Sequence, residues 1–226
     1  SSDVCSSDLR TQDELDGHAT QQGANVGDCL YKDISGPDGK PDGVIDAYDQ
    51  TVLGSGLPKV NFGLSTHMEY KGFDLNISTY GVLNYHVSDD IYNSLNSCYG
   101  YGNKEVGMLD ANRWSEDGST YLSSVPRTYA ANNATLAWND LFSSRKIQNA
   151  AYWKIANVEL GYNFPDKWFG GYVSGVRLYV SAQNLYTFTG YHGYNVDYAG
   201  GTFTPGYNFC SFPSARTFMC GLHFTF

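Results

Sequence analysis

The residues best suited to chemistry in this sequence are the aspartates between positions 33 and 49. Read from Asp38, the carboxylates follow the spacing of an EF-hand-type calcium loop, with Gly43 at the turn position: Asp38, Asp42, Asp46 and Asp49. Such a loop surrounds a hard cation with several oxygen ligands, and its glycine allows the sharp turn. A second register starts at Asp33 and Ser35 and then uses the last three of these aspartates. The spacing therefore predicts a candidate Ca²⁺ site.

Two residues depart from this calcium-loop pattern. Lys40 occupies the third position, where an oxygen ligand is expected, and Asp49 stands where a bidentate glutamate is usual. A cluster of solvated Asp-Gly turns explains the same residues, so both interpretations stay open. No nucleophile or acid–base pair accompanies the aspartates. A bound Ca²⁺ would therefore be structural, and we expect that no cofactor is required.

Composition and charge narrow the function classes. The 226 residues carry a net charge of -9, and 16% of them are charged while 15% are aromatic. Nucleic-acid binding is disfavoured, because phosphate contacts need clustered Lys and Arg. A glycoside hydrolase needs two carboxylates that converge across a pocket, but the acidic residues here cluster in one turn or stand singly on expected strands. We therefore expect that the chain is not an enzyme.

Five segments alternate apolar and polar residues with the period of a β-strand. They cover residues 60–70, 73–80, 152–163, 176–183 and 217–226. Each approaches the length that a tilted strand needs to cross a membrane, although a half-buried strand of a soluble sandwich has the same pattern. Lys154 interrupts the apolar face of the third segment, and we expect its side chain to snorkel to a headgroup region.

The connections between these segments favour a membrane barrel over a sandwich. Lys71 and Gly72 join the first two strands as a hairpin, and a short stretch joins the third and fourth. Long segments separate the second strand from the third and the fourth from the fifth, and this rhythm is typical of outer-membrane barrels. The predicted fold is therefore all-β, a partial antiparallel transmembrane β-barrel of about five strands.

The order of several motifs resembles one family. They are YKDISGPDGKPDGVIDAYDQTVLG with PKVNFGLS and YKGFDL, RWSEDG at 113–118, AYWKIANVELGYNFP at 151–165, VRLYVSAQNLYTFTGY at 176–191, and PSARTFMCGLHFTF at the end. This series resembles the C-terminal barrel of SusC/RagA-type TonB-linked outer-membrane receptors. The resemblance divides the chain into a loop segment at 10–58 and barrel strands at 59–226. Residues 1–9 resemble a translated sequencing adapter and are set aside.

The resemblance implies a TonB-dependent importer of large nutrients in the outer membrane of Bacteroidetes-type bacteria, with oligosaccharides as the expected cargo. Its implied partners are a SusD-like surface lipoprotein, the TonB complex through an N-terminal region that the sequence does not include, outer-membrane lipid and the barrel-assembly machinery. That machinery would read a C-terminal signal at Phe224 and Phe226. The alternatives are a siderophore or cobalamin receptor and a soluble, calcium-stabilised glycan-binding sandwich.

Aromatic residues in the expected outer loops are candidates for stacking on sugar rings. They are Tyr99, Tyr101, Trp114, Tyr191 and Tyr194. Packing of the loops against one another or against a partner explains the same residues. Among the dispersed cysteines, Cys98 and Cys210 are candidates for a disulfide in an oxidising compartment.

Overall fold

The computed structural model describes residues 7–8, 11–98, 103–106, 114, 126–127, 138–169, 173–197, 200–201 and 203–225. The chain divides into two compact units. The first comprises Ser1–Gly54, Val87–Gln148 and Tyr207–Cys210. The second comprises Ser55–His86, Asn149–Gly206 and Ser211–Phe226. Each unit is described by itself.

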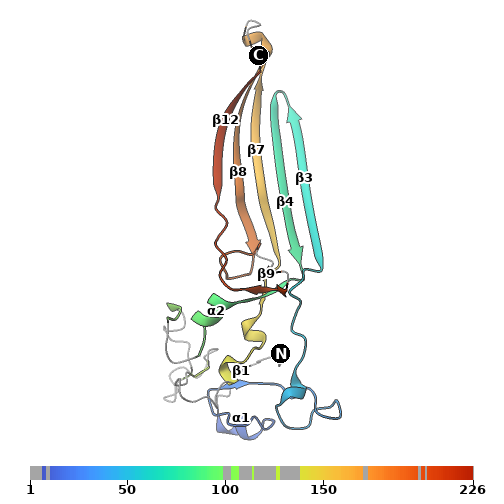
Figure 1. The fold of residues 1–226 in the computed structure, drawn as a ribbon, viewed down its shortest axis with the longest axis vertical. Coiled ribbons are helices and arrows are strands. Elements are labelled where there is room, and N and C mark those ends of the chain that lie inside the picture. The colour runs from blue at the N-terminus through green and yellow to red at the C-terminus, as the bar shows by residue number, and fades with distance from the viewer. Residues whose placement is uncertain are drawn as a thin grey trace. The chain divides into compact units, whose positions relative to one another are not determined.

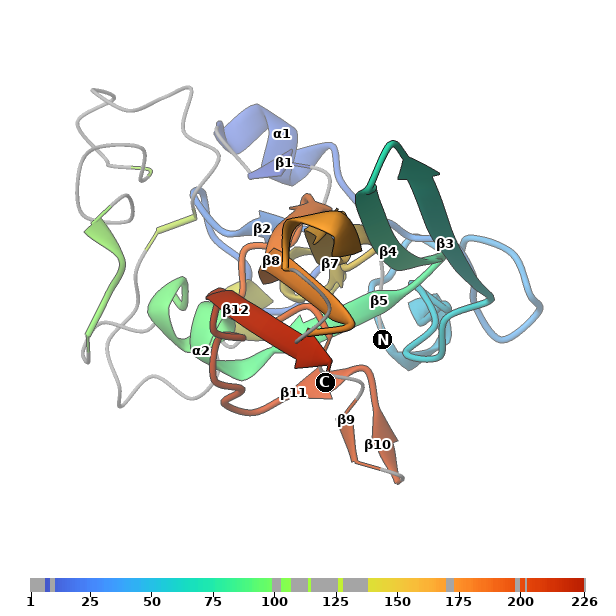
Figure 2. The same cartoon turned by 90° about the horizontal axis from the view of Figure 1, so that it is seen from above.

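The second unit is built on a five-stranded antiparallel sheet with the order β12-β8-β7-β4-β3. Figure 1 shows the strands side by side, and the view along them in Figure 2 places β3 and β12 on opposite sides. Each of the five predicted segments is one of these strands. Their bounds are β3 Val60–Tyr70, β4 Phe73–Leu83, β7 Tyr152–Phe164, β8 Gly175–Thr189 and β12 Thr217–Thr225.

The short connections lie at one end of the sheet. Lys71 and Gly72 join β3 to β4, and both have positive φ, at 48° and 86°, as a two-residue hairpin requires. The amide of Asn163 donates to the Gly72 carbonyl over 2.7 Å and fastens this turn to β7. At the same end, the amide of Ser174 donates to the carbonyl of Thr225 over 2.7 Å, so β12 ends beside the β7–β8 connection. The predicted hairpin and the predicted strand directions are confirmed.

The two faces of the sheet differ as the alternation predicts. Large apolar side chains on one face are exposed along its length, and they include Phe62, Leu64, Met68, Leu160, Leu178, Val180, Phe218, Leu222 and Phe224. We call this the outer face. The opposite, inner face carries polar and charged side chains. A row of exposed apolar residues on a long sheet is typical of a barrel wall in contact with lipid.

A β-bulge in β7 changes which side chains face outward. Strand β4 pairs with Ile155 and with Asn157, so Ala156 is an extra residue without a partner in that ladder. The extra residue reverses the alternation on its N-terminal side. Lys154 therefore lies on the inner face and is 3% exposed, whereas Trp153 lies on the outer face and is 45% exposed. The prediction that Lys154 snorkels to a headgroup region is wrong, because strand alternation was read across the bulge.

Aromatic clusters lie at both ends of the second unit's sheet. At the loop end, Trp153 and Phe188 stack with ring centroids 5.3 Å apart, and Tyr186 packs on Phe188 at 4.7 Å. At the turn end, Phe73 packs on Tyr162 at 4.6 Å. Beyond it, Phe164 contacts both Tyr162 and Trp168. Two aromatic belts separated by an apolar band are the arrangement that transmembrane barrels present at their two interfaces.

The first unit consists of short elements joined by loops. They are β1 Ser7–Asp8, α1 Gln12–Asp16, β2 Cys29–Leu30, a 3-10 turn Ala47–Asp49, α2 Asp90–Leu95, a 3-10 turn Ser144–Lys146 and β11 Tyr207–Asn208. Two further strands, β5 His86–Asp89 and β6 Gln148–Asn149, each begin or end at the boundary of the two units. Strands β1 and β2 are antiparallel, and β11 runs parallel to β5. A small core of Cys29, Tyr31 and Ile45 packs against Ala19 and Trp138. The remaining elements, β9 Gly200–Gly201, β10 Thr204–Pro205 and a 3-10 turn Asp166–Trp168, belong to the second unit.

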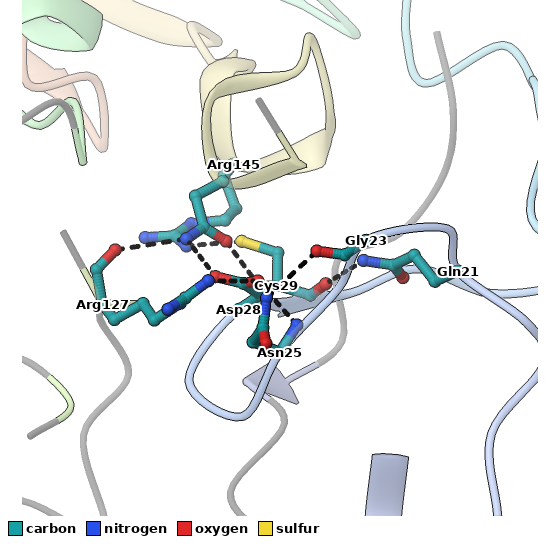
Figure 3. Close-up of polar contacts among 8 residues, drawn as sticks. Gln21, Gly23, Asn25, Asp28, Cys29, Arg127 and Arg145 are labelled. Carbon is teal, nitrogen blue, oxygen red and sulfur yellow. Dashed lines mark hydrogen bonds and ion pairs between the residues drawn. The ribbon is translucent and has the colours of Figure 1, made fainter. Parts of the chain in front are cut away.

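A buried carboxylate holds the loops of the first unit together (Figure 3). Asp28 is almost fully buried and forms a bidentate ion pair with Arg127, at 2.6 Å from Nε and 3.1 Å from Nη2. The side-chain amide of Asn139 donates to Asp28 over 2.9 Å, and so does the backbone amide of Asn25. Arg145 Nη1 lies 3.0 Å from Cys29 Sγ. Ion pairing with several hydrogen bonds is what a carboxylate needs in order to be stable in this environment.

The predicted disulfide is absent. Cys98 and Cys210 are not joined to each other, and Cys98 is buried whereas Cys210 is exposed. A buried cysteine of this kind packs as a small apolar residue. Among the described residues, no helix is long and apolar enough to cross a bilayer.

Lysine substitutions on the two faces of β8 test directly which face of the sheet contacts lipid. We expect Val180→Lys on the outer face to cost about 2–4 kcal/mol in lipid, because it places a charge against hydrocarbon. Gln183→Lys on the inner face of the same strand is the matched control and should cost far less. Urea unfolding of the whole gene product, reconstituted in lipid vesicles, gives both values. Equal losses in the two variants would contradict the assignment of the faces.

Candidate functional site

The inner face of the sheet carries a charged network close to its turn end. Arg177 on β8 donates from Nε to Asp74 Oδ1 over 3.1 Å and from Nη2 to Asp74 Oδ2 over 2.5 Å. The same Nη2 lies 2.6 Å from Glu159 Oε1 on β7. Asn163 adds a hydrogen bond of 3.1 Å to Asp74, which is nearly buried. The arrangement joins three adjacent strands by charge-assisted hydrogen bonds.

Two glycines clear the space that this network occupies. A Cβ on Gly161 would lie 2.5 Å from Asp74 Oδ1 and 2.6 Å from Arg177 Nη2. A Cβ on Gly221 would lie 2.6 Å from the ring of Tyr179. That ring in turn faces the Arg177 guanidinium at 5.2 Å. On the inner face, Tyr179 therefore lies over Gly221 of β12, and Arg177 lies over Gly161 of β7.

A second polar group lies on the outermost strand pair. His67 on β3 contacts Asn76 Oδ1 at 2.6 Å and Glu69 Oε1 at 3.0 Å, and both the imidazole and the glutamate are exposed. The inner-face charges expected from the alternation therefore pair with one another. Glu159 and Asp74 are bonded to Arg177, which reaches Asp74 across β7, and Glu69 is bonded to the imidazole of His67. The geometry suits a hydrated wall.

The loop end of the same sheet contains a pocket of about 310 Å³. Its wall combines aromatic rings, hydroxyls and amides with three charged groups. The lining comprises Lys154, Asn184, Tyr186, Thr187, Thr189, Tyr191, Gly193, Tyr194, Asn195, Val196, Asp197, Pro213, Ser214 and Arg216. All of these residues belong to the second unit. Strands β7 and β8 supply one side, and the segments 190–197 and 213–216 supply the other.

An ion pair joins the strand side of this pocket to its loop side. The Lys154 ammonium pairs with Asp197 Oδ2, and the Tyr80 ring lies 6.0 Å from the ammonium. The backbone amide of Asp197 donates to Asn195 Oδ1 over 3.0 Å. The other carboxylate oxygen, Asp197 Oδ1, is closed off from solvent. The hydroxyls of Tyr80 and Tyr152 lie within hydrogen-bonding reach of the same carboxylate, so it is enclosed by one ammonium and two phenol groups.

The aromatic site residues predicted from the sequence separate into three groups. Tyr191 and Tyr194 come together in the pocket, where Tyr191 is 8% exposed and Tyr194 is 64% exposed. Trp114 instead belongs to the first unit, with its ring beside Gly27. Tyr99 and Tyr101 lie outside the described residues. Sequence reasoning missed Asp197 and Asn184, because nothing in their local pattern distinguishes them from ordinary loop residues.

Of the two residues in the predicted assembly signal, the structure describes one. Phe224 lies on the outer face of β12, opposite Val176 of β8, and is exposed. Phe226 lies outside the described residues. The signal itself stays a prediction.

The aspartates of the acidic loop accept hydrogen bonds from backbone amides of the same loop. Asp49 is 0% exposed, and it accepts hydrogen bonds from the amides of Ile34 at 2.8 Å, Ser35 at 3.1 Å and Asp46 at 2.9 Å. Asp33 accepts from the amides of Gly43 at 2.6 Å and Asp42 at 3.3 Å. Short aspartate side chains often satisfy turn amides in this way.

The remaining carboxylates of this loop do not converge on one point. Asp42 accepts from the amide of Val44 over 3.0 Å, and Asp46 accepts from that of Tyr48 over 2.7 Å. Asp38 is exposed. In the described part of the chain, no group of three or more His, Cys, Asp and Glu side chains is arranged to hold a metal ion. Calcium binding by Asp33, Asp38, Asp42, Asp46 and Asp49 stays a prediction.

Comparison with known proteins identifies receptors to which the chain is similar. No family model matches it. "TonB-dependent receptor P3" of Formosa agariphila is 30% identical over 93% of this chain and 20% of the relative. "TonB-dependent receptor SusC" of Bacteroides thetaiotaomicron is 26% identical over 87% of this chain and 19% of the relative. The chain matches one part of the SusC/RagA-type TonB-dependent receptors. It spans about a fifth of the length of the curated relatives it matches.

Solved structures support the fold of a SusC/RagA-type barrel. The structure of the "RagAB peptide importer in the 'open-open' state" matches with a TM-score of 0.69 at 23% identity, over 88% of this chain and 21% of that one. The structure of the "RagAB peptide transporter" matches with a TM-score of 0.66 at 22% identity, over 87% and 20%. The predicted fold class is confirmed as a partial barrel, since the described strands form an open sheet.

Gly161 tests the packing of the charged network. We expect Gly161→Ala to lower the free energy of unfolding by about 1–3 kcal/mol, because its methyl group displaces Asp74 or Arg177 from their ion pair. Gly63→Ala on β3 is the matched control, since its Cβ would come no closer than 3.7 Å to the carbonyl oxygen of Thr79. Denaturant titration of the complete receptor in detergent measures both. An equal cost in the two variants would show that the network does not depend on this space.

Asp49 gives the acidic loop a pH dependence of known sign. Burial by itself raises the pKa of Asp49, but hydrogen bonds from the amides of Asp46, Ile34 and Ser35 outweigh it and lower the pKa below its usual value of 3.8. A lowered pKa in the folded state stabilises the loop at neutral pH, and this contribution is lost as the pH falls through that pKa. The protection factors of the amides in residues 33–49, corrected for the intrinsic exchange rate at each pH, should therefore fall below about pH 4.

The control for this measurement is a substitution within the same loop. Asp49→Asn should exchange rapidly already at pH 7, because an amide cannot accept all three hydrogen bonds. Asp38→Asn, at an exposed position, should keep the protection of the native loop. Unchanged exchange in Asp49→Asn would contradict the assigned role.

Proposed function

We propose that this chain is part of a TonB-dependent outer-membrane importer of large nutrients, and that its cargo is oligosaccharide. One observation carries the proposal. An amphipathic sheet with an apolar outer face and a paired, charged inner face occurs in a chain that matches TonB-dependent receptors over about nine-tenths of its length. Such a wall separates lipid from a hydrated lumen, which is the physical requirement of a pore for polar cargo.

The chemistry of the pocket supports a saccharide as the cargo. Exposed tyrosine rings offer flat apolar faces, and threonine, serine and asparagine side chains offer donors and acceptors beside them. Peptide is the second candidate, because two of the solved neighbours are described as a RagAB peptide importer or transporter. The two cargoes differ in what they ask of a site, since an extended peptide pairs through its backbone along a strand edge.

The partners follow from the same assignment. We infer a SusD-like surface lipoprotein, which would close the importer on the outside, and the TonB complex, which would supply energy from the inside. The likeness to the RagAB importer supports the first of these. The exposed outer face with its aromatic belts supports contact with outer-membrane lipid. Phe224 on the outer face of β12 supports recognition by the barrel-assembly machinery. The curated relatives are receptors, in agreement with a protein that is not an enzyme.

Deletion of the gene that carries this sequence tests the proposal. The deleted strain should fail to grow on the oligosaccharide that the receptor imports, supplied as maltohexaose, laminarihexaose, xylohexaose or mannohexaose, and should still grow on the corresponding monosaccharides. Monosaccharides cross general porins and therefore control for metabolism. Restoring the gene should restore growth. A strain that loses only the ability to take up oligopeptides would overturn the oligosaccharide assignment in favour of the second candidate.

A further inference from the structure

We propose that the segment 190–197 folds inward at the mouth of the importer, is anchored on the inner wall by Asp197, and sets the upper size of the cargo that enters. This inference rests on the proposed function and adds to it a size-limiting element with named residues. The segment follows β8 directly and belongs to the second unit, like the residues that hold it. The long connections of an outer-membrane barrel lie on its outer side, so the loop end of the sheet is the entrance.

The anchor of the segment lies on the inner face of the sheet. Lys154 pairs with the Asp197 carboxylate, and the hydroxyls of Tyr80 and Tyr152 lie within hydrogen-bonding reach of the same group. These three side chains share one face, because Tyr80 is the β4 partner of Lys154 and Tyr152 precedes Lys154 by two positions on β7. A segment whose carboxylate reaches all three must lie over the inner face of the sheet and not over the outer one.

The burial of the two faces at this end agrees with that placement. On the inner face, Lys154 and Tyr152 are both buried. On the outer face of the same strands, Trp153 and Phe188 are each almost half exposed. Neighbouring side chains along β7 therefore differ in how they are covered, because the covering segment lies on the inner side.

The segment itself has a wall side and an open side. Tyr191 and Val196 are buried, and Asp197 binds the wall. His192 and Tyr194 lie between them in the chain and are exposed, and Tyr194 keeps most of its surface free. Because the wall is on one side, these two exposed side chains face the open space of the entrance. The segment therefore narrows the entrance by its backbone and by the side chains of His192 and Tyr194.

The segment is held in one shape before cargo arrives. The Tyr191 amide donates to Thr189 Oγ1 over 3.1 Å, and the Asp197 amide donates to Asn195 Oδ1 over 3.0 Å. A Cβ on Gly193 would come within 2.3 Å of the Tyr191 ring, so the backbone passes close over that ring. Hydrogen bonds at both ends and close packing between them oppose local opening. A segment fixed in this way excludes cargo by size, whereas a mobile loop would move aside.

The pocket beside the segment makes Asp197 a principal point of attachment. The pocket, of about 310 Å³, lies between the segment and the inner-face residues Lys154, Thr187 and Thr189. Across this space the segment does not pack against the strands, so the ion pair at its end carries much of the attachment. Loss of the Asp197 carboxylate is therefore expected to release the segment from the wall.

Hydrogen exchange of the complete receptor in detergent tests the anchor. Asp197→Ala should lower the protection factors of the amides in residues 190–197 at least about tenfold, because it leaves the Lys154 ammonium buried without its partner. Asp38→Ala is the matched control, since it removes an exposed carboxylate outside this network. It should leave these protection factors unchanged. Unchanged protection in Asp197→Ala would overturn the anchor.

Uptake of sugar chains of graded length tests the size limit. Cells whose surface glycan-cleaving enzymes have been deleted are given partial hydrolysates of amylose, laminarin, xylan and mannan. Chromatography of the medium gives the longest chain that they remove, normalised to the amount of receptor in the outer membrane. Tyr194→Ala trims the entrance without touching the anchor, and Asp197→Ala releases the segment. Both should raise the longest accepted length by one or more sugar units, whereas Asp38→Ala should not change it.

The outcomes separate the size limit from the proposed function. If the native receptor takes up sugar chains and Tyr194→Ala accepts none that are longer, the size limit is overturned while the proposed function stands. This outcome is decisive even where Asp197→Ala fails to reach the membrane, because the Tyr194 side chain is exposed and its loss leaves the anchor intact. If the native cells take up peptides and none of the sugars, the oligosaccharide assignment fails. A tryptic digest of casein then replaces the hydrolysates, and longer peptides in both variants would support the size limit, whereas an unchanged length would overturn it.

Discussion

The structure depends on one constraint, which is that each strand side chain can point in only two directions. In this sheet the two directions lead to different surroundings, because the outer face is apolar and the inner face is charged. A single extra residue therefore exchanges the two sets of side chains. The bulge at Ala156 makes this exchange within β7, and it moves Lys154 to the inner face while Trp153 joins the outer aromatic belt. Without the bulge, a charged ammonium would face lipid.

The same constraint explains why the inner face uses glycine and charge together. A strand that faces water on one side must still pack closely enough to keep its neighbours in register. Gly161 and Gly221 allow this, because they let Arg177 and Tyr179 lie flat across the strands. The guanidinium then bonds to carboxylates on β4 and β7. Cross-strand pairs of this kind fix the register as well as the surface chemistry.

Much of the fold could be predicted from local sequence. The positions of the strands, the Lys71-Gly72 hairpin and the two faces follow from alternation and turn chemistry, which act over a few residues. The loop-side ends do not, since β4 and β8 continue to Leu83 and Thr189, beyond the predicted ends at 80 and 183. The bulge could not be predicted, since Ala156 is an ordinary strand residue and only its lack of a partner in β4 reveals it. Lys154 breaking the apolar pattern was the available signal, but snorkelling explained it equally well.

Of the residues in the candidate site, only the aromatic ones could be predicted from the sequence. Tyr191 and Tyr194 were found because a loop rich in tyrosine is informative by composition. Asp197 was missed because its role depends on Lys154, which is 43 positions away in the chain. The acidic loop shows how one pattern can serve two roles. Its spacing predicts a cation site, and aspartates at turns also accept hydrogen bonds from backbone amides, as Asp33 and Asp49 do here.

The ion pair between Lys154 and Asp197 is best understood through its cost. Burying two charges is expensive, and apolar residues of similar size are often at least as stabilising. Stability alone therefore gives little reason for an ion pair at this position. What the pair does provide is direction, because the ammonium on β7 binds one particular carboxylate and so fixes where the segment 190–197 meets the strand. A pair of apolar residues would hold the loop without specifying its position so closely.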